Sequence, residues 1–265
     1  MRAIRLLTAI AMLVLAGCAG LKSDRVRFDG LSGCPGQTAA MLAARQSQYG
    51  PLSDTHTLEC ALTVLRDSQD PALRRTSLGS RLSLHLAERE ANPDRREKLA
   101  AEGVSLAEAA LAQGADDDAA VHYYLAANLG LAVREHITLA MDNLERLEGA
   151  MKRALALNPD IDHGGPLRLL GALYLKAPAW PSGIGDLDKA LELLEKAVNK
   201  HPAHPLNHLF YAQALWHEGD EAGLSRAKAE FTLGEKLLAE GNWGYSKESW
   251  KKEFAEFRQD LKNGL

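Results

Sequence analysis

The chain has 265 residues, a formal net charge of −4 at pH 7, and 46% hydrophobic residues. A mildly acidic chain without a cluster of Lys and Arg among aromatic residues is not expected to bind nucleic acid. Its length is sufficient for one elongated domain with a sizeable core.

The first 17 residues are interpreted as a secretory leader. Arg2 and Arg5 precede an apolar run, residues 6–16, that is too short to span a bilayer. The run ends in the letters LAGC, which resemble the bacterial lipobox. In that motif the peptidase cuts before the cysteine, here Cys18, and the cysteine receives fatty acyl chains, palmitate among them. The alternative is an ordinary signal peptide with a chance cysteine.

A lipidated Cys18 would attach the chain to the periplasmic side of a bacterial membrane without a transmembrane helix. Ala19 stands where an aspartate would indicate retention in the inner membrane, which favours the outer membrane. Residues 18–37 contain several glycines and scattered charges, so we expect the lipidated cysteine and a tether there. Residues 38–265 are then the folded domain.

Cys34 and Cys60 are the two cysteines left after the leader. Exported proteins keep disulfides, and an even count suits a pair, so we expect a bridge between the first two helices. Two buried free thiols are the alternative.

From residue 38 onward the apolar residues recur at helical spacing, and no alternating runs predict strands. The predicted fold class is all-α. The predicted helices are Thr38–Tyr49, Thr55–Asp67, Pro71–Arg89, Pro93–Gln113, Asp117–Arg134, His136–Leu157, Leu167–Lys176, Leu187–Lys200, His204–Glu218, Glu221–Ala239 and Ser246–Lys262.

These helices form pairs that resemble degenerate tetratricopeptide repeats, which are helical hairpins with small residues at fixed places and a closing proline. The clearest pair is 167–200, in which Gly171, Ala190 and Ala197 lie where the two helices would touch. Pro202 ends its second helix. We therefore expect an α-solenoid of four such hairpins, closed by a C-terminal capping helix.

No pattern in the sequence indicates catalysis. There is no nucleophile elbow or HExxH motif, and Gly183-Ile184-Gly185 follows no strand and is not followed by a Lys-Ser/Thr pair. His201 and His204 are separated by Pro202 and lack a carboxylate or cysteine to complete a zinc site. We expect no enzyme activity, no catalytic residues, no metal and no cofactor.

Binding is better supported, by the loop that joins the two helices of the clearest pair. Trp180 lies in it between two prolines and is a candidate anchor for a partner, unless it folds back on its own hairpin. Arg168, on an otherwise apolar helix, is a candidate ligand for an anion, or it pairs with Asp186 or Asp162. The remaining candidates are Tyr174 on the same helix and Asn207 and His208 at the start of the next helix.

The segment GGPLRLLGALYLKAPAWPSGIGDLDKALELLEKAVNKHPAHPLNHLFYAQAL resembles the T-component family of tripartite ATP-independent periplasmic (TRAP) transporters. The shared features are a Gly-Pro-x-Arg start, the Ala-Pro-x-Trp-Pro-x-Gly loop, a Gly-Asp helix start and a His-Pro-Leu-Asn segment. The resemblance implies a lipid-anchored helical protein whose partner is the periplasmic solute-binding protein of such a transporter. It also implies a possible homotrimer with a tunnel in each subunit.

Two functions remain open at this point. One is an accessory protein that docks a solute-binding protein and holds a small hydrophobic or carboxylate ligand in a cavity near Trp180, Arg168 and Tyr174. The other is an envelope scaffold lipoprotein that uses its repeats for protein–protein assembly, with no ligand and no transport role.

Overall fold

The computed structural model describes residues 21, 25–28, 31, 34 and 37–263. Cys18 and the leader lie outside the described residues. The first helices are α1 (Ala39–Ala44), α2 (Thr55–Asp67), α3 (Pro71–Arg74), α4 (Leu78–Ala87), α5 (Pro93–Ala112), α6 (Ala119–Ala132) and α7 (Ile137–Asp142). They are followed by α8 (Leu144–Leu157), α9 (Gly165–Lys176), α10 (Leu187–Lys200), α11 (Pro205–Glu218), α12 (Glu221–Glu240) and α13 (Ser246–Asn263).

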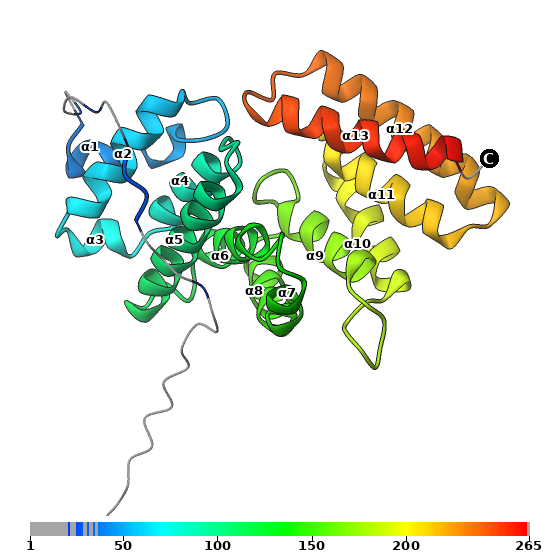
Figure 1. The fold of residues 1–265 in the computed structure, drawn as a ribbon, viewed down its shortest axis with the longest axis horizontal. Coiled ribbons are helices and arrows are strands. Elements are labelled where there is room, and N and C mark those ends of the chain that lie inside the picture. The colour runs from blue at the N-terminus through cyan, green and yellow to red at the C-terminus, as the bar shows by residue number, and fades with distance from the viewer. Residues whose placement is uncertain (1–20, 22–24, 29–30, 32–33, 35–36, 264–265) are drawn as a thin grey trace, which may run out of the picture.

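The all-α prediction is confirmed, because the described residues contain no strand beyond one isolated bridge. The helices pack as four successive antiparallel pairs, α4 with α5, α6 with α8, α9 with α10 and α11 with α12. Each pair also contacts the next along the chain, which produces the curved stack of Figure 1. The last helix, α13, packs against α11 and α12 and covers the end of the stack.

Several helices begin at the residues predicted from the sequence, and a side chain caps each of these starts. The carboxylate of Asp54 accepts from the Thr57 amide at 2.8 Å, and the amide oxygen of Asn92 accepts from the Arg95 amide at 3.0 Å. Asp186 caps α10 in the same way. These bonds satisfy amide groups that have no partner within the helix.

Two long predicted helices are interrupted, and in each case one polar side chain explains the break. The helix expected over 71–89 is divided because Thr76 donates its hydroxyl to the Leu73 carbonyl and accepts from the Leu78 amide. The helix expected over 136–157 is divided at Asn143, whose amide donates to the Leu139 carbonyl at 2.8 Å. Both side chains compete with the helical backbone bonds. The predicted helix 38–49 is also shorter, with α1 followed by a turn of 3-10 helix at 46–48.

Part of the expected tether packs against the helical domain. Val26 is buried in the smaller of two hydrophobic clusters, to which α1–α5 and the end of α6 contribute. The Arg66 guanidinium lies 4.8 Å from the centre of the Phe28 ring and donates to the Val26 carbonyl at 3.0 Å. Residues 25–28 (dark blue in Figure 1) are therefore part of the fold, and not free chain.

Covalent and polar contacts secure this N-terminal end further. Cys34 and Cys60 are joined by a disulfide, with their Cα atoms 5.4 Å apart. Glu102 of α5 accepts two bonds from Arg66, at 2.7 and 2.5 Å, and both side chains are largely buried. The bridge and the ion pair tie the N-terminal segment to α2 and α2 to α5.

The two ends of the solenoid touch each other, which the sequence did not predict. The Tyr245 amide, in the turn before α13, donates to the Pro51 carbonyl in the loop before α2. Arg89 stacks on the Tyr245 ring at 3.9 Å and donates to the carbonyls of Ser53 and Gly50. The curved stack is thus closed on itself at this contact (Figure 1).

Candidate functional site

The inserted loop of the central hairpin connects α9 to α10 and carries Trp180 at its tip. Trp180 is 85% exposed, so the loop holds it away from its own hairpin. Among the large apolar side chains of the described residues, only Ile137 of α7 is similarly exposed, at 83%. An exposed tryptophan is costly in water and is a typical anchor in protein interfaces.

Backbone contacts hold this loop in one conformation. The Gly185 amide donates to the Pro178 carbonyl at 2.8 Å, and the Asp186 amide donates to the Tyr174 carbonyl at 3.0 Å. A Cβ atom at Gly183 would lie 2.5 Å from the Pro178 carbonyl oxygen, so only glycine fits there. The loop presents Trp180 on a preformed framework.

Tyr174 lies at the base of the same hairpin, but its side chain is buried. Its hydroxyl donates to the Glu148 carboxylate of α8 at 2.6 Å. Burial, together with this bond to a carboxylate, raises the pKa of the Tyr174 hydroxyl. Its contacts join α9 to α8 and leave its hydroxyl engaged within the protein.

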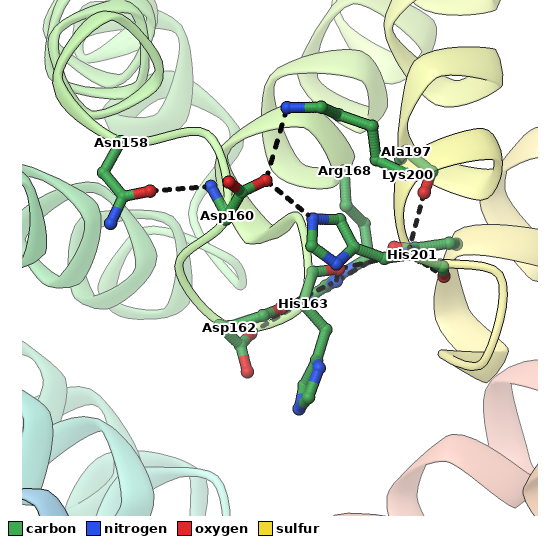
Figure 2. Close-up of polar contacts among 9 residues, drawn as sticks. Asn158, Asp160, Asp162, His163, Arg168, Ala197, Lys200 and His201 are labelled. Atoms are coloured by element: carbon green, nitrogen blue, oxygen red, sulfur yellow. Dashed lines mark hydrogen bonds and ion pairs between the residues drawn. The ribbon is translucent and has the colours of Figure 1, made fainter.

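Arg168 is the centre of a polar cluster where the α8–α9 turn meets the start of α11 (Figure 2). It is 3% exposed. Its Nη2 donates to the Asp162 carboxylate at 2.6 Å, and its Nη1 donates to the Asn207 side-chain oxygen at 3.0 Å. Of the two carboxylates considered from the sequence, Asp162 is the partner, because the turn bends it back over Arg168. Asp162 and His163 have positive φ angles of 48° and 53° in that turn.

A second carboxylate joins the same turn to the end of α10. Asp160 accepts from His201 at 3.0 Å and from Lys200 at 3.3 Å, with Asn158 on its other side (Figure 2). The bond from His201, and to a lesser extent the bond from Lys200, holds the pKa of Asp160 below its ordinary value. The α8–α9 turn is thereby connected to α10 as well as to α11.

Asn207 and His208 are buried in the same region. The Asn207 amide donates to the carbonyls of His163 and His201 at 3.1 and 3.0 Å, so it bridges the two turns. His208 lies between the Glu230 carboxylate at 2.6 Å and the Pro202 carbonyl at 2.7 Å. Burial disfavours its charged form, but these two acceptors outweigh burial and raise the pKa of His208.

His204 is a site residue whose role the sequence did not show. Its ring stacks on His163 at 5.7 Å and contacts the indoles of Trp243 and Trp250 at 5.3 and 5.2 Å. Burial, reinforced by the charge of nearby Arg168, holds the pKa of His204 far below its ordinary value, so the ring is neutral. No local pattern announced this cluster, because both tryptophans come from the region of the capping helix.

Of the five candidate binding residues, the structure therefore brings Arg168, Asn207 and His208 together and places Trp180 apart from them. Two cavities lie away from these residues, one between α12 and α13 and one between α2, α3 and α5. Within the described residues, no three His, Cys, Asp or Glu side chains are grouped to hold a metal ion. None of the described helices is long and apolar enough to cross a membrane.

The comparison with protein families identifies this architecture. The family described as TRAP transporter T-component matches residues 72–227, which is more than half of the chain. The chain belongs to the TRAP transporter T-component family. The matched span includes the inserted loop and the whole Arg168 cluster. No curated protein matches the chain in sequence.

Membership in the T-component family makes this a TRAP transporter-associated protein. The family is an accessory component of transport and is not known as an enzyme family. Its role is membrane-associated and periplasmic, in bacteria.

Proposed function

We propose that this T-component is a lipid-anchored periplasmic accessory protein that docks the solute-binding protein of a TRAP transporter through its inserted loop. The observation that carries the proposal is Trp180, 85% exposed at the tip of a loop whose backbone is held by its own hydrogen bonds. Family membership supports the identity of the partner as a component of a TRAP transporter.

Trp180 exposes a large apolar ring to water, and burying such a ring in a partner is favourable. A loop that already holds its bound shape loses little conformational entropy on binding. Interface energy concentrates in a few residues of this kind, often tryptophan.

The membrane attachment in this proposal rests on Cys18, which would carry the acyl chains. The outer membrane is the favoured location. Assembly as a homotrimer is part of the same proposal, with family membership as its support.

A small hydrophobic or carboxylate ligand is not assigned to Arg168 or Tyr174. The two terminal nitrogens of Arg168 donate to Asp162 and Asn207, and the Tyr174 hydroxyl donates to Glu148. Within the described residues, the buried Nε of Arg168 has no acceptor.

The test is capture from periplasmic extract with the chain from residue 19, read by mass spectrometry. We expect a TRAP-type solute-binding protein to be captured by the wild-type chain and by Ile137→Ala, and lost with Trp180→Ala. Ile137 is the matched control because it is equally exposed on another element. Capture of envelope assembly proteins, indifferent to Trp180, would instead support the scaffold function.

A further inference from the structure

A cavity of about 270 Å³ lies between α2, α3 and α5, beside the N-terminal segment 25–28. Its volume is just below the range of roughly 300–1,000 Å³ that small-molecule sites occupy. One part of its wall is apolar, from Leu65, Leu73 and Leu106, and another is basic, from Arg25 and Arg74. It is separate from the Trp180 loop and from the Arg168 cluster.

The charges on this wall do not balance. Arg66 and Glu102 also line the cavity, but they neutralise each other through two hydrogen bonds. Glu102 is the only carboxylate among the lining residues, so the charges of Arg25 and Arg74 are left over. The site is therefore positive overall.

The unused hydrogen-bond donors are on the same two arginines. The Thr76 hydroxyl donates to the Leu73 carbonyl of α3, the Ser105 hydroxyl donates to a carbonyl of its own helix, and the Gln113 amide donates to the Ala109 carbonyl. Arg74 uses only its Nε, which donates to the Ser68 carbonyl at 3.0 Å. Within the described part of the chain, the terminal nitrogens of Arg74 and the guanidinium of Arg25 have no acceptor.

We propose that this cavity binds the phosphate group of an amphiphile, with Arg25 and Arg74 holding the phosphate and the leucines contacting the apolar part. Guanidinium groups present paired donors that match phosphate oxygens. Arg25 and Arg74 come from separate segments of the chain, and both line the cavity.

The position of the cavity indicates the source of that phosphate. Arg25 is seven positions after Cys18, and an extended chain spans at most ~3.6 Å per residue, so Arg25 stays within about 25 Å of a lipidated Cys18. A membrane phospholipid is then the nearest phosphate-bearing amphiphile. This step rests on the proposed lipidation of Cys18, whereas the cavity and its charges do not.

The test is calorimetric titration of the chain from residue 18 carrying Cys18→Ser, which keeps every described residue and has no acyl chain. The probe is dihexanoyl phosphatidylglycerol below its micelle concentration. We expect it to bind, and we expect Arg25→Ala with Arg74→Ala to weaken binding at least about tenfold, because the two changes remove charge-assisted hydrogen bonds to the phosphate. The matched control is Arg27→Ala with Arg75→Ala, which removes the same charge beside the cavity and should bind like the parent chain.

Other probes separate the sources and the chemistry. Inorganic phosphate that binds as tightly as the phospholipid would make a free anion the ligand, and overturn the amphiphile. Binding of hexyl glucoside or hexanoate at the same affinity would overturn phosphate recognition. Equal weakening in both double variants would show general attraction by surface charge, and no binding of any probe would refute the site.

The titration tests phospholipid binding independently of the docking proposal. The titration contains no partner and no membrane, so its failure leaves the Trp180 experiment unchanged. Conversely, a chain that captures no solute-binding protein can still bind the phospholipid here.

Discussion

Replacing Arg168 by methionine should destabilise the protein by about 3 kcal/mol. The change removes a charge-assisted bond to Asp162 at 2.6 Å, worth roughly 1.5–3 kcal/mol, and leaves the Asn207 oxygen without its donor, which costs roughly 1–3 kcal/mol. Two longer bonds, to the carbonyls of Asp162 and His163, add little. The substitution also removes the cost of burying a guanidinium, and Asp162 is exposed enough to be solvated once it loses its partner. The net loss of stability should therefore be about 3 kcal/mol, less than the upper limits of the two contributions added together.

The assay is urea unfolding at pH 7, followed by circular dichroism. Arg153→Met is the matched control, because Arg153 makes exposed contacts, an ion pair with Asp117 and a hydrogen bond to the Asp116 carbonyl, both at 3.3 Å. We expect that control to change the free energy of unfolding by less than about 0.5 kcal/mol. A loss below about 1 kcal/mol in Arg168→Met would refute the reasoning, since the cluster would then not hold α9 to α11.

Three further predictions concern other parts of the fold. Between pH 6.5 and 5 the unfolded chain takes up a proton that buried His204 does not bind in the folded state, so the contribution of His204 to stability should fall by about 2 kcal/mol as the pH falls. His208, whose pKa is raised, contributes with the opposite sign in both the parent chain and the variant. Urea unfolding of His204→Phe should lose that part of the pH slope, and an unchanged slope would contradict a neutral buried ring. Replacing Cys34 and Cys60 together by alanine should cost about 3 kcal/mol in the same assay, because the disulfide closes a loop of 26 residues; an unchanged unfolding midpoint would refute this. Arg89→Ala should speed hydrogen exchange of the Tyr245 amide about tenfold, because Arg89 stacks on that ring and helps to hold the ends together. Unchanged exchange, measured by NMR, would show that the ends do not depend on Arg89.

Periodicity predicted the helices and their pairing because those signals are local. Gly171 and Ala190 were expected where α9 meets α10, and a Cβ atom at Gly171 would indeed lie 2.6 Å from Leu194. The helix breaks at Thr76 and Asn143 were not predicted, because each depends on one side chain that hydrogen-bonds to a nearby backbone carbonyl and not to water.

The candidate site was predicted less fully, because it depends on contacts between distant segments. Both Asp162 and Asp186 are near enough in sequence to reach Arg168, and the positive φ angles of the turn decide between them. His204 contacts tryptophans that follow α12, which no local pattern indicates. The contact between Tyr245 and Pro51 depends on the curvature accumulated over all the helical pairs.

The most direct test of the account is the affinity of the captured solute-binding protein for this chain. It would be measured by calorimetry with the wild-type chain, Trp180→Ala and Ile137→Ala. The account predicts about thirtyfold weaker binding for Trp180→Ala, the loss of a residue worth 2 kcal/mol, and less than about twofold change for Ile137→Ala. Unchanged affinity in Trp180→Ala, with the fold intact, would contradict docking through the inserted loop.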